Sequence, residues 1–290
     1  MLKKSYIENL FQTSDIMMDF PNAKINIGLN IKEKRTDGFH NIETIFYPLT
    51  LSDILEIQVE SDNDSSTLTN TGLTVDTPNE NNIVFKAFET IRKFNIIPEV
   101  NMHLHKIIPF GAGLGGGSSD AVFTLKILNE LFTLEKQEDQ LQDYAESLGS
   151  DCPFFLKNTP QYAFEKGNKM EPLNISLKGY TIILVVPNIQ ISTKFAYQGV
   201  KTTQPEVSLK KCIEEIPVKE WKYYIQNDFE SHLFEHYKEL KNIKDQLYQA
   251  GAVFASLSGS GSAIFGIFEE TPPEVHFPNS YFTWEETLKY

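Results

Sequence analysis

The chain has 290 residues, 41% of them hydrophobic, which is enough for two domains or for one large domain with a packed core. Its 26 basic and 39 acidic side chains give a formal net charge of −13, which argues against a nucleic-acid-binding protein and against docking on an anionic membrane. Two cysteines and the lack of any apolar run of membrane-spanning length favour a cytoplasmic protein, and the sequence leaves its oligomeric state open.

The N-terminal part of the chain is expected to begin with an extension, followed by a strand. Residues 1–20 contain no long apolar stretch and no cleavage site, so we expect an extension and not a secretory signal. Apolar and polar residues alternate over residues 23–31, which predicts a strand with one buried face. Lys24 and Asn26 fall together on the polar face of this strand and could reach a common ligand.

Alternation, capping and turn residues predict the next elements. We expect strands at residues 41–48 and 54–59, a polar loop with at most short strands at 62–82 and a helix at 83–94. Asn82 is a suitable N-cap for that helix, because its side chain can accept a hydrogen bond from a free backbone N–H.

The most informative segment is a glycine-rich run at residues 109–121, which reads P-F-G-A-G-L-G-G-G-S-S-D-A. Five glycines within seven positions are costly unless backbone amides must approach a ligand closely. Successive N–H groups can bind an anion, and the helix expected after them would aim the positive end of its dipole at the same place. We therefore predict a polyphosphate-binding loop and not a flexible linker or an ordinary turn.

Two other phosphate loops fit this run poorly. Gly111, Gly113 and Gly116 match G-x-G-x-x-G, but the dinucleotide loop follows a buried parallel strand and precedes an acid at the end of the next strand. Residues 100–105 alternate between apolar and polar side chains, which indicates a half-exposed strand and not a central parallel one. The P-loop pattern also fails, because no lysine precedes Ser118.

The rest of the chain mixes helices and strands without a regular β-α-β order. We expect helices at residues 119–131, 137–148, 195–200, 228–239 and 242–250, and strands at 180–186, 253–258, 263–268 and 281–288. Residues 157–160 are the best candidate for a domain boundary. This mixture favours an α+β fold.

Short motifs spread along the chain carry a resemblance to a known family. The glycine-rich run resembles the phosphate loop of the GHMP small-molecule kinases, P-x-x-x-G-L-G-S-S-A, with an additional Gly-Gly after Leu114 and with Asp120 before the alanine. Within that superfamily, the motifs P-N-A-K-I-N-I-G-L at 21–29, R-T-D-G-F-H at 35–40 and G-S-D-C-P at 149–153 resemble the family of 4-diphosphocytidyl-2-C-methyl-D-erythritol kinases.

The resemblance implies a two-domain GHMP-kinase fold of class α+β. Residues 21–160 would form the ATP-binding N-terminal domain, similar to domain 2 of ribosomal protein S5, and residues 161–290 a ferredoxin-like α/β sandwich. It implies transfer of the γ-phosphate of ATP, with Mg²⁺, to the 2-hydroxyl of 4-diphosphocytidyl-2-C-methyl-D-erythritol in the non-mevalonate route to isoprenoid precursors. The expected partners are small molecules, with neither nucleic acid nor membrane.

The resemblance also implies roles for individual residues. Asp151 matches the family's general base, and Lys24 matches a lysine that contacts both the base and the reacting hydroxyl. From pattern alone, Asp151 would be a turn aspartate and Lys24 an exposed strand lysine. The residues expected to hold ATP are Lys106, Pro109, Gly111, Ala112, Gly113, Leu114, Gly115, Gly116, Gly117, Ser118 and Ser119. Lys106 could also be a solvated strand lysine, and the Ser118 and Ser119 hydroxyls could bind either phosphate or Mg²⁺.

The residues expected at the acceptor substrate are Asn26, Phe39, His40, Thr193, Tyr197, Gly259 and Ser260. Phe39 stands where the family usually has tyrosine and would stack on cytosine. Tyr197 would supply the second stacking ring, and His40 would bind the cytosine edge. Thr193 and Tyr197 could instead serve ordinary helix-start capping and packing.

Three further features have plainer interpretations. Residues 257–263 match the family's C-terminal glycine loop, although alone they would be read as a hairpin turn. The sequence N-D-F-E at 227–230 also resembles a family motif but is typical of a helix cap. Cys152 lies beside the expected base, and we interpret it as a packing residue and not a nucleophile, because no histidine or other base is tied to it by the sequence.

Three alternative functions stay open. One is another GHMP kinase, acting on mevalonate, homoserine or a sugar, which the motif at residues 35–40 disfavours. Another is a catalytically silent nucleotide-binding protein. The presence of both Lys24 and Asp151 disfavours this alternative. A dinucleotide-dependent oxidoreductase is the third.

Overall fold

The computed structural model of the protein describes residues 16–60, 65–75, 77–200, 202, 205 and 207–290. The chain divides into two compact units, each assembled from separate stretches of sequence. Within the described residues, the first unit contains the chain up to Asn22, Leu51–Ile108 and Gly116–Lys157, and the second contains Ala23–Thr50, Pro109–Gly115 and Asn158–Tyr290. The division into domains at residue 160 stays a prediction. Ala23–Thr50 and Pro109–Gly115, expected in the N-terminal domain, belong to the unit that holds Asn158–Tyr290.

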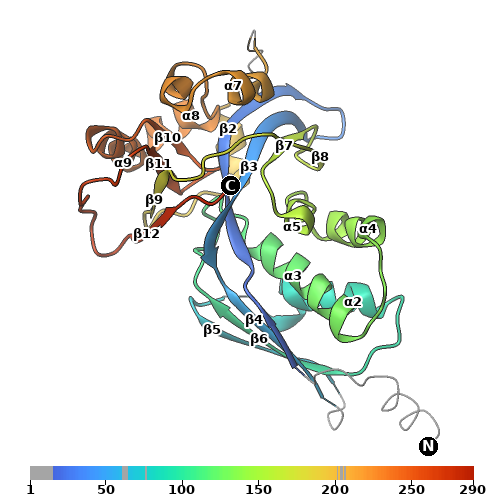
Figure 1. Ribbon diagram of the computed structural model, residues 1–290. Coiled ribbons are helices and arrows are strands. Elements are labelled where there is room, and N and C mark those ends of the chain that lie inside the picture. The colour runs from blue at the N-terminus through green and yellow to red at the C-terminus, as the bar shows by residue number, and fades with distance from the viewer. Residues whose placement is uncertain (1–15, 61–64, 76, 201, 203–204, 206) are drawn as a thin grey trace, which may run out of the picture. The chain divides into compact units, whose positions relative to one another are not determined.

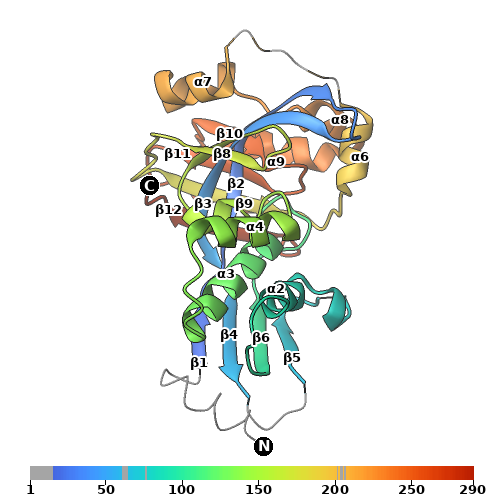
Figure 2. The ribbon, with the colours of Figure 1, turned by 90° about the vertical axis from the view of Figure 1, so that its right-hand side faces the viewer.

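Among the described residues, the first unit is built on a four-stranded sheet with the order β1-β4-β6-β5 (Figure 2). Its strands are β1 (Ile16–Asp19), β4 (Ile54–Val59), β5 (Thr67–Gly72) and β6 (Val100–Lys106). Along β6, buried residues alternate with half-buried ones, as the sequence predicts. The strand is interior to the sheet, antiparallel to β4 and parallel to β5, so it is not flanked by parallel strands on both sides.

Helices α2 and α3 lie on one face of this sheet (Figure 1). The helices of the unit are η1 (Asn79–Asn81, a 3₁₀ helix), α2 (Ile83–Arg92), α3 (Gly116–Leu131), α4 (Glu138–Leu148) and α5 (Phe154–Lys157). Asn82 caps α2 as predicted, since its Oδ1 accepts a hydrogen bond from the Val84 N–H at 2.9 Å. Helix α3 begins three residues before its predicted start, which puts Gly116 and Gly117 in its first turn.

Strand β1 falls within residues 1–20, the expected N-terminal extension, which stays a prediction. Ile16–Asp19 pairs antiparallel with residues 55–58 of β4, so this stretch belongs to the folded first unit. Residues 1–15, on which the rest of the expected extension falls, lie outside the described residues.

In the part of the chain that the structure describes, the second unit contains two four-stranded sheets. One has the order β2-β3-β7-β8 and consists of β2 (Asn22–Lys34), β3 (His40–Ser52), β7 (Gln161–Phe164) and β8 (Lys169–Pro172). The other has the order β10-β11-β9-β12 and consists of β9 (Thr181–Val186), β10 (Phe254–Leu257), β11 (Ile264–Phe268) and β12 (Phe282–Thr287). Every pair of the second sheet is antiparallel.

The helices of the second unit are α6 (Thr193–Gln198), α7 (Leu209–Glu215), η2 (Val218–Tyr223), α8 (Phe229–His236) and α9 (Lys238–Gln249). Helix α9 packs against β10 and β11, and its residues Leu240, Ile243 and Leu247 belong to the apolar core there. Among the described residues, every helix is too short or too polar to span a lipid bilayer.

Strand β2 differs from its prediction in one respect. Its first ten residues are all buried, so neither face is open to solvent. Lys24 is only 2% exposed and Asn26 only 3%. Because burying a charged or polar group is costly unless it is paired, these side chains need partners inside the protein.

Candidate active site

Lys24 lies against the phosphate-binding loop predicted from the sequence. Its Nζ donates hydrogen bonds to the Gly113 carbonyl at 3.0 Å and to Asn26 Oδ1 at 2.6 Å. Its backbone N–H donates to the Leu114 carbonyl at 2.9 Å, so main chain and side chain both tie β2 to the loop. Nζ also lies 4.8 Å from the centroid of the Phe46 ring. The structure thus brings a buried ammonium group to the middle of the glycine-rich run.

The second glycine-rich loop, residues 257–263, contacts the same carbonyl. Ser258 Oγ donates to the Gly113 carbonyl at 2.8 Å and accepts the Asn26 N–H at 3.1 Å. The Ala263 N–H donates to the Ala112 carbonyl at 3.1 Å. The two glycine-rich loops and β2 therefore form one hydrogen-bonded cluster within the second unit.

The glycines of this cluster are required for different reasons. Gly113 has a φ of +78°, and a Cβ on it would lie 2.0 Å from the Ser258 carbonyl oxygen. Gly259 has a φ of +55°, and a Cβ on it would lie 3.1 Å from Asn26 Oδ1. Gly111 has a φ of +62°, but no described atom lies within 4 Å of the position of its Cβ. Residue 113 must therefore be glycine because its neighbours leave no room for a Cβ. At residue 111, glycine is favoured only because the backbone has a positive φ.

Helix α3 continues directly from the glycine-rich loop. The first N–H groups of an α-helix have no partner within the helix and favour a bound anion. Ser118 and Ser119 lie in the first turns of this helix. Ser119 is fully buried, and its Oγ has no hydrogen-bond partner among the described residues.

Asp151 lies in the turn between α4 and α5. A Cβ on Gly149, which ends α4, would lie 3.3 Å from Cys152 Sγ and 4.0 Å from Ser118 Oγ, so this turn lies beside the first turn of α3. The Ser150 hydroxyl donates to Asp151 Oδ1 at 3.3 Å. Cys152 is fully buried, and burial raises the pKa of its thiol to about 12. Burial thus favours the protonated thiol, and the interpretation of Cys152 as a packing residue and not a nucleophile stays a prediction.

Lys106 is not a solvated strand lysine, because only 1% of it is exposed. Its Nζ donates to Asp120 Oδ2 at 2.7 Å and to Asp53 Oδ2. Asp53 Oδ1 accepts the N–H groups of Ile107 at 2.6 Å and Ile108 at 2.9 Å, which directly precede the glycine-rich loop. Burial raises the pKa of Asp120 to about 8, and the Lys106 ammonium opposes that shift. This buried ion cluster ties the two ends of the loop, and the expected contact of Lys106 with ATP stays a prediction.

Two of the rings expected to bind cytosine lie together. His40 and Tyr197 are stacked, with ring centroids 4.6 Å apart and planes 18° apart. Phe39 is 60% exposed, and the Lys166 ammonium lies 5.1 Å from the centroid of its ring. Burial, together with the positive charge of Lys34, lowers the pKa of His40, which favours the neutral ring.

The N-terminus of α6 borders a cavity next to the glycine-rich loop. Ser192 caps the helix, since its Oγ accepts the Phe195 N–H at 3.2 Å, and Thr193 is exposed in the first turn. The cavity has a volume of about 610 Å³ and is lined by Phe110, Gly111, Phe195 and other residues. Because Ser192 caps α6, the exposed Thr193 hydroxyl does not serve as the helix cap.

Comparison with known proteins identifies the family. Family models match the chain over residues 82–158 for the GHMP kinases N terminal domain and over residues 210–276 for the GHMP kinases C terminal domain. A curated relative from Parabacteroides distasonis, named 4-diphosphocytidyl-2-C-methyl-D-erythritol kinase, is 47% identical over 94% of this chain and 100% of its own length. A relative of the same name from Bacteroides thetaiotaomicron is 46% identical over the same shares. The chain belongs to the 4-diphosphocytidyl-2-C-methyl-D-erythritol kinase family.

Solved structures of kinases share the fold of this chain. A crystal structure of 4-(cytidine 5'-diphospho)-2C-methyl-D-erythritol kinase matches this chain with a TM-score of 0.74 at 30% identity, covering 87% of this chain and 90% of that one. Homoserine kinase from Cytophaga hutchinsonii matches with a TM-score of 0.61 at 13% identity, covering 96% of each chain, which shows the fold alone. The predicted α+β GHMP-kinase fold is therefore confirmed.

Sequence reasoning did not single out every residue of this GHMP-kinase cluster. Thr44 Oγ1 accepts the Asn26 side-chain amide at 2.9 Å and donates to the Gly28 carbonyl at 2.6 Å. Ser258 lies in the glycine-rich motif at residues 257–263, but the sequence places the expected contacts to the acceptor at Gly259 and Ser260. The motif's position pointed to Ser258, whereas no pattern in the sequence marks Thr44.

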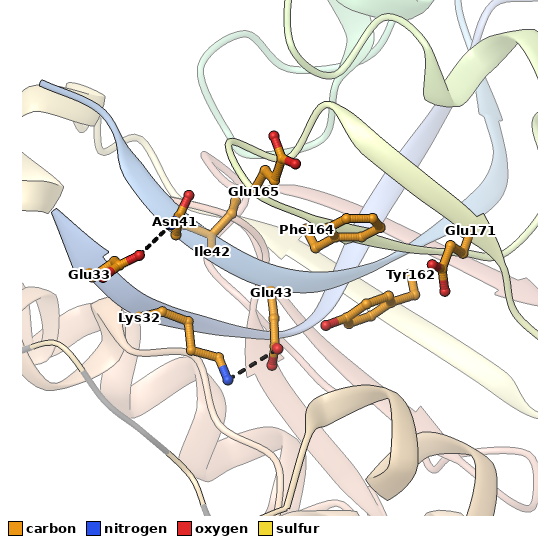
Figure 3. Close-up of a pocket in the computed structure, with 9 residues that line it drawn as sticks. All are labelled: Lys32, Glu33, Asn41, Ile42, Glu43, Tyr162, Phe164, Glu165 and Glu171. Atoms are coloured by element: carbon orange, nitrogen blue, oxygen red, sulfur yellow. Dashed lines mark hydrogen bonds and ion pairs between the residues drawn. The ribbon is translucent and has the colours of Figure 1, made fainter. Parts of the chain in front are cut away.

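Another cavity of the second unit, of about 380 Å³, contains none of the predicted site residues (Figure 3). Lys32 pairs with Glu43 at 3.1 Å, and Asn41 donates to Glu33 Oε1 at 2.6 Å along its wall. Several of its charged and polar groups thus already have partners within the kinase's own sheet.

Proposed function

We propose that the chain transfers the γ-phosphate of ATP to the 2-hydroxyl of 4-diphosphocytidyl-2-C-methyl-D-erythritol, in the non-mevalonate route to isoprenoid precursors. The observation that carries the proposal is the hydrogen bond of the Lys24 ammonium to the Gly113 carbonyl, at 3.0 Å, inside a glycine-rich loop. The relatives that are 46% and 47% identical to this chain support the choice of acceptor through their names.

Phosphoryl transfer asks a protein mainly for alignment and for neutralisation of charge. We assign the backbone N–H groups of residues 111–119 to the phosphates of ATP. Lys24 would add a positive charge that is only 2% exposed, and such a charge acts more strongly than one in water. The hydrogen bonds of Lys24 to the loop and to Asn26 support this assignment, because they fix the ammonium without further ordering during the reaction.

Asp151 is assigned as the general base. Its carboxylate would take the proton of the 2-hydroxyl while that oxygen bonds to the γ-phosphorus. The bond from this phosphorus to the β–γ bridging oxygen breaks at the same time, and ADP leaves. The family motif at residues 149–153 and the position of this turn beside the first turn of α3 support the assignment.

Mg²⁺ would enter the site bound to ATP. Kinases hold this ion through phosphate oxygens, waters and one or two protein oxygens. The Ser119 hydroxyl fits such a need, since it is buried and lacks a hydrogen-bond partner in the described part of the chain, and Ser118 offers a neighbouring hydroxyl. The bound ion would neutralise charge on the β- and γ-phosphate oxygens.

The cytosine of the acceptor is assigned to the aromatic residues of the second unit. A flat base can stack on Phe39 or Tyr197, and a neutral imidazole at His40 can both donate and accept a hydrogen bond at the base edge. The residues assigned to the remainder of the acceptor are Asn26, Thr193, Gly259 and Ser260. Because both cysteines, Cys152 and Cys212, are free, we assign the reaction to the cytoplasm, a reducing compartment.

Consumption of ATP by the purified protein tests the proposal. The assay compares 4-diphosphocytidyl-2-C-methyl-D-erythritol with mevalonate and homoserine, and mass spectrometry locates the new phosphate. We expect turnover with the cytidylyl compound alone. Turnover with another of the three alcohols would replace the acceptor, and failure to bind ATP would overturn the assignment as a kinase.

A further inference from the structure

Residues 227–230, with the sequence N-D-F-E, do not act mainly as a helix cap. Asp228 occupies the N-cap position of α8, but its side chain makes no capping hydrogen bond. It accepts the Ile31 N–H of β2 at 2.6 Å instead, so the capping prediction was wrong for this residue. The neighbouring Asn227 does accept the Phe229 N–H at 3.0 Å, but its amide group has other partners as well.

The Asn227 side chain forms two hydrogen bonds to the main chain of the second glycine-rich loop. It is 2% exposed, and its Nδ2 donates to the Leu257 carbonyl at 2.9 Å and to the Gly259 carbonyl at 2.8 Å. These two carbonyls flank Ser258, so one amide fixes the main chain on both sides of that residue. An asparagine side chain offers two donors and one acceptor in a fixed plane, and this site uses all of them.

Ser258 connects the second glycine-rich loop to the phosphate-binding loop. Its hydroxyl donates to the Gly113 carbonyl at 2.8 Å, to which Lys24 Nζ also donates at 3.0 Å. A shift of Ser258 would therefore disturb the carbonyl that orients the Lys24 ammonium.

Two further contacts hold Asn227 and the loop in register with β2. Asn227 forms a parallel bridge with Leu29, on the strand that also carries Lys24. Glu230 Oε1 accepts the Leu257 N–H at 2.9 Å, which secures the entry into the loop. The motif thus joins β2, the strand that carries Lys24, to the second glycine-rich loop.

We propose that Asn227 is a positioning residue for phosphoryl transfer, which acts through Ser258 to hold the Gly113 carbonyl and the Lys24 ammonium in place for the phosphates of ATP. The role of Asn227 in catalysis rests on the proposed function. Its effect on ATP binding can be measured without the acceptor.

A double-mutant cycle tests the inference. The variants are Asn227→Ala, Ser258→Ala and their combination, and the readouts are the Kd of ATP by calorimetry and kcat and KM for both substrates. We expect each single change to raise the Kd of ATP by about tenfold and the double change to raise it no further, because both remove the same constraint. KM for the acceptor should change less than KM for ATP.

A matched control separates positioning from lost stability. Leu247→Ala removes a fully buried side chain from α9 and should lower the melting temperature without changing the Kd of ATP. If Asn227→Ala does not fold, Asn227→Asp replaces it in the cycle, since it keeps the shape but loses both donors. Additive effects in the cycle, or an unchanged Kd in the Asn227 variants, would overturn the inference. Failure to phosphorylate the cytidylyl acceptor would overturn the proposed function and leave the ATP-binding cycle interpretable.

Discussion

Replacing Gly113 with alanine tests how closely the two glycine-rich loops are packed. At a φ of +78°, the alanine would cost about 1–2 kcal/mol in backbone strain. Its Cβ would lie 2.0 Å from the Ser258 carbonyl oxygen, so the loops would have to separate. Separation would break the hydrogen bonds that the Gly113 carbonyl accepts from Ser258 Oγ and Lys24 Nζ, worth about 1 and about 2 kcal/mol. The total expected cost is about 4–5 kcal/mol.

The matched control is Gly111→Ala. This residue shares the positive φ, at +62°, but no described atom lies within 4 Å of the added Cβ, so only the strain of about 1–2 kcal/mol remains. Calorimetric titration with ATP should show a loss of affinity of about tenfold for Gly111→Ala and more than about 100-fold for Gly113→Ala. Equal losses in the two variants would refute the reasoning, because only Gly113 has a close neighbour.

Three further predictions concern charged residues. Asp151→Asn should lower kcat by about 10²–10⁴-fold and leave the Kd of ATP within about threefold, and a fall of less than about tenfold would contradict its role as the base. Lys106→Met should lower the free energy of unfolding in urea by about 3–5 kcal/mol, since buried carboxylates lose their cation, whereas Lys210→Met at an exposed ion pair should leave this free energy nearly unchanged. Equal losses would count against the ion cluster. Lys34→Gln should raise the pKa of His40 toward its ordinary value in an NMR titration, because a positive charge disfavours the imidazolium; an unchanged pKa would mean that burial alone lowers it.

The sequence predicted the parts of the site better than the contacts among them. Glycine density located the loop that Lys24 contacts, and alternation placed Lys24 and Asn26 on one face of β2, where their side chains are joined by a hydrogen bond of 2.6 Å. The hydrogen bond between Ser258 and Gly113 joins residues 145 positions apart, and such a contact leaves no periodicity or composition in the chain. It could be found only from the fold.

The wrong predictions share a physical cause. Alternation reports whether a side chain is polar but not whether the protein supplies it with a partner. Lys24 occupies a polar position of an alternating strand, whereas Lys106 falls in register with the apolar residues Val100, Met102 and Leu104. They are 2% and 1% exposed, because a carbonyl group pairs with the Lys24 ammonium and carboxylate groups pair with that of Lys106. In the same way, Ile16–Asp19 gave no pattern long enough to predict a strand that depends on pairing with β4.

The interleaving of the two units has a consequence for synthesis on the ribosome. The first unit has all its residues once Lys157 has been made, whereas strands β2 and β3 of the second unit emerge early and must wait for β7, which begins at Gln161. Until then, the apolar side chains of an early hairpin have no sheet to join, and such a nascent chain is prone to aggregate. A gene cut near codon 160 would accordingly yield a first fragment with every residue of the first unit and two unpaired strands, β2 and β3, of the second. The second fragment would lack these two strands, so this enzyme cannot be separated into its two units by one cut in the gene.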